Sequence, residues 1–473
     1  MARFRHASHS AVAAVIFLGL VLLASGCSSK APDPRSLDML PDTVSSTLPR
    51  QTEYPPVSKW WEQFNSHDLD RLITRALTHN FSIRQARARL EQAAALTAAQ
   101  KAGSLPLVTM EGGYNRTRSD QDSDSLNTFS LGPAASYEVD LWGRINADIT
   151  AVQLETQASG FDLETAAMTV AAEVSRTWVD LITAGEQLNR VRKQLDLNTT
   201  VLNLLELRFE NSMSSALDIL QQREVVARTQ AKIPPLENQR QQLTAALHLL
   251  LGQTPNTGPK ITGVLPDTLP DLPQKGLPAN LLALRPDVRA AGSRLVAADW
   301  NETAARADRL PDLVLTGNFL LRDSVLDGLL ENWILTLGSR LVGTVFDGGH
   351  QKALSQQAAA VVKERLATYE KVVHTAIVEV ETSLAAEKHQ TEHIAQLAAQ
   401  LQAARQALNE ARRRYINGLA LFISFLTEQL NVQELEIRFL EQKALLVKNR
   451  IALYRALGGD WQSIVLPTQK EAS

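Results

Sequence analysis

Hydrophobic and polar positions in the first part of the chain change from a helical period to a strand period. Apolar residues between 69 and 101 recur every three or four positions, which predicts a helix that Gly103 and Pro106 end. Between 107 and 139 apolar residues alternate with polar or small ones, which predicts two strands, each with one apolar face. The stretch 115–127 between them is rich in Ser and Asp and is expected to form an exposed loop.

A helical pattern returns after residue 140 and continues much longer. No proline interrupts residues 140–210, which at about 1.5 Å per residue would form a rod of about 100 Å. Asn211-Ser-Met-Ser-Ser215 breaks the pattern, and a second helix is predicted to run back to Leu251. Pro234-Pro235 should break or kink this return helix, because proline lacks a backbone donor and clashes with the preceding turn.

The same plan occurs twice along the chain. The stretch that begins at Pro106 recurs in kind at Pro311, and 206 residues separate Gly252 from Gly458. A near-constant spacing of this kind indicates one structural unit built twice. The second unit has no proline pair, since Leu440 and Glu441 occupy the matching positions, so the two helical hairpins are expected to differ in curvature.

The repeat sets the expected organisation of the chain. The expected segments are a signal peptide at 1–26, a lipidated tether at 27–59, a first repeat at 60–252 with a β-hairpin at 105–140 and a long helical hairpin at 141–251, a Pro/Gly-rich linker at 253–278, a second repeat at 279–458 with a β-hairpin at 311–346 and a long helical hairpin at 347–457, and a tail at 459–473. The predicted fold class is therefore mainly α, with four strands per chain and an internal two-fold repeat.

The N-terminus has the pattern of a secretory signal. Two arginines precede an apolar run at 11–24, which is short for a membrane span, and Leu23-Ala-Ser-Gly-Cys27 places the only cysteine where a lipobox has one. We expect cleavage before Cys27, with a diacylglycerol and an N-acyl chain on Cys27, and Ser28 favours the outer membrane. The alternatives are an ordinary signal peptide that ends near Gly26, or an N-terminal anchor helix.

Composition narrows the class of protein further. The chain after Cys27 has no thiol, so it needs neither disulfides nor thiolate chemistry in an oxidising compartment. A net charge of −3 over 473 residues gives no indication of nucleic-acid binding. No segment after Cys27 resembles a transmembrane helix, so a protein that crosses a membrane with this chain would have to do so as strands.

Four predicted strands of about 10 residues are long enough to cross a bilayer when tilted. They are too few to close, because even the smallest membrane barrels need about eight strands and an open edge in hydrocarbon leaves backbone groups unpaired. Several chains would therefore share one barrel, and their long Ala- and Leu-rich helices would pack side by side into a cylinder. The alternative is a small soluble sandwich packed on helices.

Several motifs give the chain a recognisable family resemblance. They are Trp60-Trp61-x-x-Phe64, the segment Ala76 to Leu90, Arg285-Pro286-Asp287-Val288, Asp140-Leu-Trp-Gly143-Arg144 and Phe346-Asp-Gly-Gly349. In this order and at this duplicated spacing the chain resembles the TolC-like outer-membrane efflux proteins, in particular the lipoprotein (NodT-type) branch. The resemblance implies a homotrimer with a twelve-stranded β-barrel, a long α-helical barrel and a belt of shorter segments. It also implies two partners, a periplasmic adaptor (membrane fusion) protein and an inner-membrane efflux pump, typically of the resistance-nodulation-division (RND) type.

In such a family the periplasmic turns of the helical hairpins close the channel and dock the adaptor. The resemblance places Asn211 and Ser212 in the first turn and Gly418 in the second, and it implies an Asp218–Tyr415 hydrogen bond within or between chains. The alternative is that these two side chains are separately solvated. Gly418 is expected to adopt a positive φ, and the turn at Ser212 is expected to be shaped differently.

The closing residues should differ from those of TolC. Ser424 and Thr427 align with the two acidic positions that ring the narrowest point there, whereas Leu421 and Phe422 follow the second turn. Our hypothesis is that closure is partly hydrophobic, by dewetting. The alternative is that Leu421 and Phe422 pack between helices.

The predicted function is that of a passive outer-membrane exit duct, lipid-anchored and membrane-spanning, with a long periplasmic extension, through which a pump expels drugs, metals or organic toxins. No catalytic site, cofactor or metal is expected. His389-Gln-Thr-Glu-His393 matches a zinc-protease pattern but lies within a polar helical stretch, where a solvated helix face is the expectation. The alternative function is a periplasmic coiled-coil scaffold lipoprotein without a pore.

Overall fold

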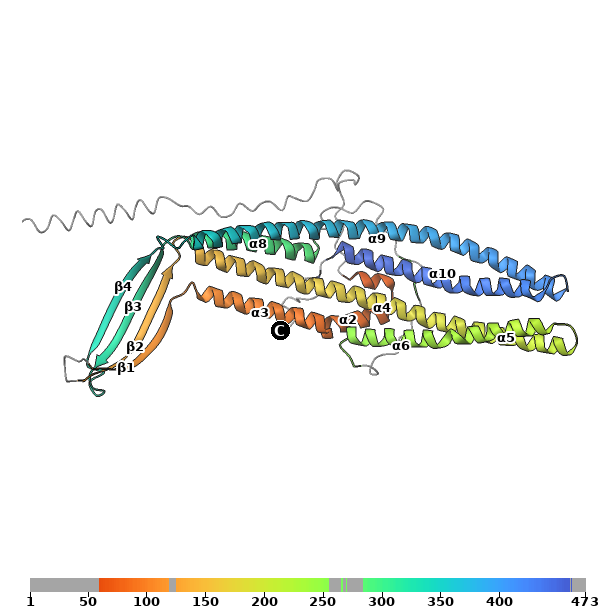
Figure 1. Ribbon diagram of the computed structural model, residues 1–473, viewed down its shortest axis with the longest axis horizontal. Coiled ribbons are helices and arrows are strands. Elements are labelled where there is room, and N and C mark those ends of the chain that lie inside the picture. Colours follow the sequence, from red (N-terminus) through yellow and green to blue (C-terminus); the bar gives the residue numbers. More distant parts are fainter. Residues whose placement is uncertain are drawn as a thin grey trace, which may run out of the picture. The chain divides into compact units, whose positions relative to one another are not determined.

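The computed structural model describes residues 59–118, 125–254, 265, 266, 269, 284–459 and 461. Cys27, the signal peptide, the tether and nearly all of the expected linker and tail lie outside these residues. One order occurs twice along the chain: a helix, two strands, a long helix and a return arm (Figure 1). The first half also has η3 and α2, and its return arm is split in two. In chain order they are η3 (Trp60–Phe64), α2 (His67–His79), α3 (Phe81–Ala102), β1 (Leu107–Arg118), β2 (Ser125–Val139), α4 (Arg144–Glu210), α5 (Ala216–Ala231), α6 (Ile233–Leu250), α8 (Pro286–Ala307), β3 (Asp312–Asp323), β4 (Trp333–Val342), α9 (His350–Ile416) and α10 (Phe422–Leu457).

The chain divides into two compact units. Of the described residues, the first unit holds those within 91–158 and 291–369, which include all four strands, and the second holds those within 59–90, 159–254, 284–290 and 370–459, which include both hairpin turns. The long helices α4 and α9 contribute residues to both units. The prediction of helices and four strands arranged as a repeat is confirmed.

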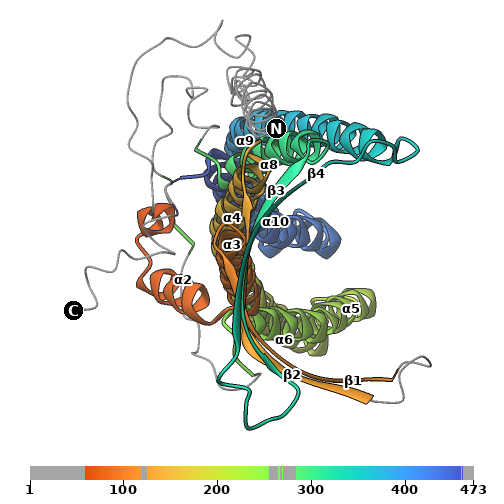
Figure 2. The same cartoon turned by 90° about the vertical axis from the view of Figure 1, so that its left-hand side faces the viewer.

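The four strands form one antiparallel sheet in the order β1-β2-β3-β4, which is curved in Figure 2. The two predicted hairpins, β1–β2 and β3–β4, are therefore joined by pairing between β2 and β3. That pairing skips Gly132 and Pro133, where proline cannot donate to a ladder. Among the described strands, β1 and β4 are each paired on one side only.

The first predicted helix is in fact two helices that meet at Asn80. The Asn80 Oδ1 accepts hydrogen bonds from the backbone N–H groups of Ser82 (2.8 Å) and Ile83 (3.3 Å), so it caps α3. Its Nδ2 donates to the carbonyl oxygen of Leu250, 2.8 Å away at the end of α6. A continuous periodicity concealed this break. The cap itself is local, and the bond to Leu250, 170 positions away, holds the Asn80 amide in place.

The prediction of a break at Pro234-Pro235 is confirmed. α5 ends at Ala231 and α6 begins at Ile233 with its two prolines in the first turn, where their missing N–H groups leave no unmade helical bond. In the second repeat α10 runs unbroken from Phe422 to Leu457. The return arms of the two hairpins therefore differ as the prolines imply.

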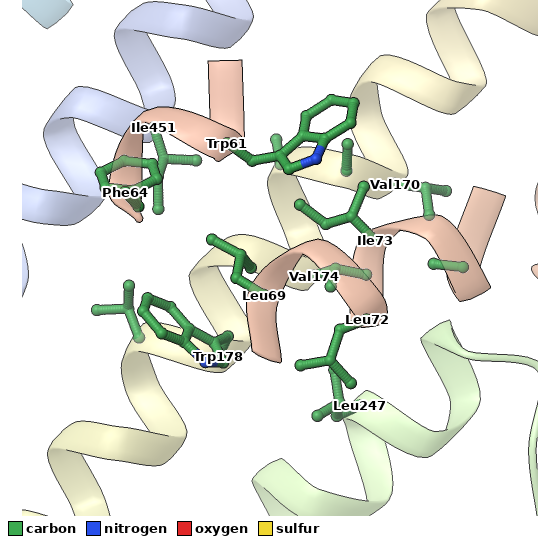
Figure 3. Close-up of a cluster of buried hydrophobic side chains, with 14 of the residues drawn as sticks. Trp61, Phe64, Leu69, Leu72, Ile73, Val170, Val174, Trp178, Leu247 and Ile451 are labelled. Atoms are coloured by element: carbon green, nitrogen blue, oxygen red, sulfur yellow. The ribbon is translucent and has the colours of Figure 1, made fainter. Parts of the chain in front are cut away.

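A hydrophobic core fixes the short N-terminal helices to the long ones in the second unit (Figure 3). Trp61, Leu69 and Ile73 from η3 and α2 are buried in one cluster with Trp178 from α4 and Ile451 from α10. Burial of each such side chain stabilises the packed state by about 1.5–3 kcal/mol. The Trp60-Trp61-x-x-Phe64 motif is thus a structural anchor.

None of the helices in the described parts of the chain is both long and apolar enough to cross a membrane.

Candidate functional site at the hairpin turns

Each long helix ends in the same kind of turn. Ser212 and Gly418 both have a left-handed backbone, with φ of 59° and 70°. In the first turn the N–H of Met213 donates to the carbonyl of Arg208 at 2.7 Å, and in the second the N–H of Leu419 donates to the carbonyl of Arg414 at 2.8 Å. These are Schellman-type ends in both cases. The positive φ of Gly418 is confirmed, but the expectation of a different first turn is wrong, because Ser212 adopts the conformation that glycine provides more cheaply.

Asp218 is committed to capping its own helix. Its Oδ2 accepts a hydrogen bond from the backbone N–H of Ser215 (3.0 Å), and the Ser215 hydroxyl oxygen accepts one from the N–H of Asp218 (3.1 Å). This reciprocal capping box satisfies two backbone donors at the start of α5. The carboxylate therefore helps to set the geometry of the first turn.

Tyr415 joins the second turn to the first. Its ring stacks on Phe425 at 6.0 Å between centroids, and the guanidinium of Arg208 lies 5.1 Å from its ring centre. Burial raises the pKa of the Tyr415 phenol, and the Asp218 carboxylate raises it further, whereas the Arg208 cation opposes the shift. The phenolic oxygen is buried and has no hydrogen-bond partner in the described part of the chain, so the predicted bond to Asp218 is absent within one protomer.

The two candidate gating residues of the second turn differ in burial. Phe422 is 2% exposed and packs in a cluster with Leu205 and Ile219 of the first hairpin, whereas Leu421 is 76% exposed. A residue buried inside its own protomer cannot line a lumen in this conformation. The hypothesis of a hydrophobic constriction by both residues is therefore corrected to Leu421, and Phe422 follows the alternative of packing between helices.

The other predicted turn residues are exposed and satisfy local hydrogen bonds. The Asn211 amide donates to the carbonyl of Leu207 (2.8 Å), and the Thr427 hydroxyl donates to the carbonyl of Ile423 (2.8 Å). Ser424 is exposed on the first turn of α10. Neither Ser424 nor Thr427 supplies a negative charge at the second turn.

A buried amide network behind the turns was not predicted. The Asn198 Oδ1 accepts hydrogen bonds from the side-chain amides of Gln429 (2.7 Å) and Gln433 (3.1 Å), and its Nδ2 donates to the Thr229 hydroxyl (3.0 Å). The Asn198 backbone carbonyl accepts from the Gln222 amide (2.7 Å). The network thus joins α4, α5 and α10, and so couples the first hairpin to the second.

A sequence signal for this network existed. Gln222 lies three residues from both Ile219 and Val225, and Gln429 interrupts a buried run of the same spacing in α10. An amide on the buried stripe of a helix must find a partner there, because an unpaired buried polar group costs about 1–3 kcal/mol. Only the assembled hairpins show that these amides share Asn198.

His389 and His393 are exposed on α9, and His389 Nδ1 lies 3.3 Å from Glu392 Oε2. Across the described residues, no group of three or more His, Cys, Asp or Glu side chains is placed to hold a metal ion. The expected lipidation site, Cys27, falls outside the described residues.

Known proteins resemble this chain over almost its whole length. A family model described as outer membrane efflux protein matches residues 72–253 and 277–459. The chain is 31% identical over 458 residues to the pyoverdine export outer membrane protein OpmQ of Pseudomonas putida, covering 94% of this chain and 97% of that protein. It is 30% identical to outer membrane protein OprJ of Pseudomonas aeruginosa, covering 93% and 95%. The structure of the outer-membrane channel OprN matches with a TM-score of 0.81 at 26% identity, covering 87% of this chain and 94% of that one.

Proposed function

Since this chain belongs to the outer membrane efflux protein family, we infer that it is an outer-membrane channel through which an efflux system discharges its substrates. The observation that carries this conclusion is the match of the family model to both repeats, one segment in each half of the chain. The relatives align nearly end to end, so the likeness includes the strands, the long helices and the turns together. The alternative of a scaffold without a pore leaves the sheet and its free edges without a role.

We further propose that the channel is a homotrimer. Its four strands have two free edges, and edges of this kind in a hydrocarbon phase must be paired. Three copies would contribute twelve strands to one closed sheet, and their helical hairpins would pack laterally around a shared lumen. Cys27, with its diacylglycerol and N-acyl chain, would anchor each copy in the outer membrane.

The hairpin turns are the proposed docking site for a periplasmic adaptor, which would link the channel to an inner-membrane pump of the RND type. In the closed state Leu421 would narrow the lumen. The Tyr415 hydroxyl, which has no partner within the described residues of its own protomer, would find one in a polar network with Asp218 of a neighbouring copy. The protein itself would conduct passively and catalyse no reaction, because the pump supplies the energy.

The names of the relatives indicate only the broad class of compounds that the channel would conduct. One relative is named for pyoverdine export and another for toluene efflux, which are chemically unlike. We propose that the duct is permissive and conducts organic compounds, drugs or metals selected upstream by the pump.

The proposed function is tested by conductance and by efflux. The purified full-length protein, reconstituted in a planar bilayer, is expected to give discrete single-channel currents, and a deletion strain should become more sensitive to drugs or solvents. A preparation that inserts in lipid yet conducts no ions would overturn the channel and favour the scaffold. A C27A variant should retain conductance in reconstituted bilayers but lose outer-membrane anchoring of its N-terminus.

A further inference from the structure

The outer edges of the four-stranded sheet are both long. β1 and β4 each pair with one neighbour among the described strands, and the apolar side chains of Val108, Met110, Leu337 and Leu341 on them are exposed. An unprotected edge of this length is a template for another strand. The occupant of these edges can be deduced from the chain itself, because it is built from two similar halves.

The seam between the halves, where β2 pairs with β3, is a template for the seam between copies. β2 is the second strand of the first repeat, and β3 is the first strand of the second. In a closed ring of copies, β4 is again the second strand of a repeat, and β1 of the next copy is the first strand of the repeat that follows. The register of one seam can therefore be transferred to the other.

The transfer uses two spacings read from the sequence. Pro311 stands 205 residues after Pro106 at the start of the first strands, and Gly338 stands 206 residues after Gly132 in the second strands. When 205 is added to each β1 residue number and 206 to each β2 residue number, the observed β1–β2 pairs yield all the observed β3–β4 pairs. Ala135 pairs with Gly317 across the internal seam, and its counterpart pair is Leu341 with Gly112.

We propose that β4 of one copy pairs antiparallel with β1 of the next copy in the register that places Leu341 opposite Gly112, and that Val345 and Phe346 are the apolar anchor of this seam. The proposal rests on the proposed assembly of several copies and specifies how their sheets join. It assigns a second copy of this chain to both free edges.

The transferred register was derived from the internal seam and residue numbering alone, and it nevertheless places exposed apolar residues opposite one another. Val345 is 101% exposed and Phe346 is 89% exposed just beyond β4. Extended along the same ladder, Val345 falls opposite Val108, and Phe346 falls opposite Leu107, both of which are also exposed. Opposed apolar pairs on a sheet face stabilise the pairing by about 0.2–1 kcal/mol each.

Both faces of the sheet remain consistent across the new seam. Leu335, Leu337 and Leu341 would continue the apolar face that carries Val108 and Met110, whereas a slip of one residue would place them on the polar face. On the polar face Glu111 of one copy becomes the diagonal neighbour of Arg340 of the other. Diagonal neighbours lie about 7–8 Å apart, within reach of these long side chains.

The internal seam explains why an apolar anchor is needed between copies. Inside the chain, Arg144 of the first repeat lies 3.8 Å from Asp308 of the second and also bonds to Glu138, and the Trp142 indole N–H donates to the carbonyl of Pro311 (2.8 Å). Asp148 also faces Arg144, at 3.6 Å. Burial raises the pKa of Asp148 and the neighbouring carboxylates of Asp308 and Asp140 add to that shift, whereas Arg144 opposes it, so several acidic side chains gather around this cation.

These ionic residues do not recur in the second repeat. The positions that correspond to Glu138, Trp142, Arg144 and Asp148 are held by Thr344, Gly348, His350 and Leu354. The seam between copies therefore lacks the arginine-centred cluster and the tryptophan. Val345 and Phe346 replace that fixed ionic contact with a hydrophobic one, as expected where two separate chains must associate.

Disulfide trapping tests the register directly. The sequence has one cysteine, Cys27, which is the expected lipid attachment site. Disulfides in the sheet can therefore form only between introduced cysteines. The double variants L341C/G112C and V342C/E111C represent two successive predicted pairs, which covers both alternating cross-strand spacings. L341C/Y114C and L341C/M110C, shifted by two residues in either direction, are the matched controls, and each single-cysteine variant controls for random collision.

Under mild oxidation in membranes, at least one predicted pair is expected to yield covalent dimers and trimers on denaturing gels, several-fold more than the shifted pairs. Preferential trapping of a shifted pair would overturn the register while leaving the channel intact. No trapping in any pair, in variants that still conduct, would overturn the pairing of β4 with β1. If no double variant forms a cross-link and the wild-type protein also fails to conduct ions, the proposed function itself is refuted.

The apolar anchor is tested by F346S, with V325S as the control for an exposed valine in the β3–β4 loop. F346S should shift the assembled trimer toward monomer by at least several-fold at a fixed detergent concentration, and V325S should leave it unchanged. Equal trimer content in F346S and the wild type would overturn the anchor role.

Discussion

At the residue scale, the two hairpin turns show how one backbone geometry is met by different side chains. Ser212 and Gly418 have nearly the same positive φ and the same flanking hydrogen bonds. A left-handed conformation costs a residue with a Cβ atom about 1–2 kcal/mol, whereas glycine adopts it freely. The strain at Ser212 thus lies within a turn for which we propose a role in docking.

Exchanging these residues should have opposite effects. S212G removes a Cβ atom from a left-handed residue and is expected to stabilise the protein by up to about 1 kcal/mol. G418S adds a Cβ atom at the equivalent position and should destabilise the protein by about the same amount. Thermal unfolding followed by circular dichroism measures both. Destabilisation by S212G would show that the serine side chain contributes more than its backbone strain costs.

Leu421 and Phe422 are adjacent but should respond differently to polar substitution. L421S removes an exposed apolar side chain and is expected to raise single-channel conductance with little change in stability. F422S removes a buried aromatic ring and should lower stability by about 3–5 kcal/mol, the range for large core truncations. Paired conductance and unfolding measurements separate the two. An unchanged conductance in L421S counts against a hydrophobic gate.

Gly132 permits a close approach of strands in the sheet. A Cβ atom at this position would lie 1.9 Å from the carbonyl oxygen of Phe319, whereas one at Gly317 would meet only the flexible side chain of Leu337 at 3.4 Å. G132A is therefore expected to reduce the yield of assembled, heat-resistant protein strongly, and G317A only slightly. Gel mobility of unheated samples gives the comparison, and equal yields would mean that the strands adjust without cost.

At the scale of elements, Asn198 couples the two helical hairpins. Its side chain and carbonyl satisfy amides from α5 and α10 inside a fully buried site. N198A would leave the Gln429 amide without its acceptor, while the Thr229 hydroxyl would keep its bond to the Val225 carbonyl. We therefore expect a loss of about 1–3 kcal/mol for the unsatisfied amide alone. Thermal unfolding checks this, with N203A, at an exposed position on the same helix, as the control. An N198A variant as stable as the control would mean that water or the other amides replace Asn198.

At the scale of the whole molecule, duplication gives the chain two hairpins, two strand pairs and one internal seam. Among the described strands, the same duplication leaves two sheet edges unpaired, and the proposed neighbouring copies would pair them. The halves have diverged where their surroundings differ. The first repeat has an arginine cluster at a seam within the chain, and the second has Val345 and Phe346 at an edge.

The sequence by itself determined the order of elements, the repeat and the break at Pro234-Pro235. These follow from local rules, since helical and strand periods, proline geometry and duplicated spacing are written in consecutive residues. The resemblance of the motifs to a known family was also sufficient to indicate an outer-membrane efflux channel, and the relatives bear this out.

Only the tertiary structure decided which side chains are covered and which pairs meet. Nothing in the sequence around Leu421 and Phe422 distinguishes the exposed residue from the buried one, because burial of Phe422 depends on Leu205 and Ile219 in the other hairpin. The split at Asn80, which also contacts Leu250, and the shared amide of Asn198 have the same origin. In each case a partner far away in the chain fixes the local choice, and free energy that depends on distant contacts cannot be read from neighbouring residues.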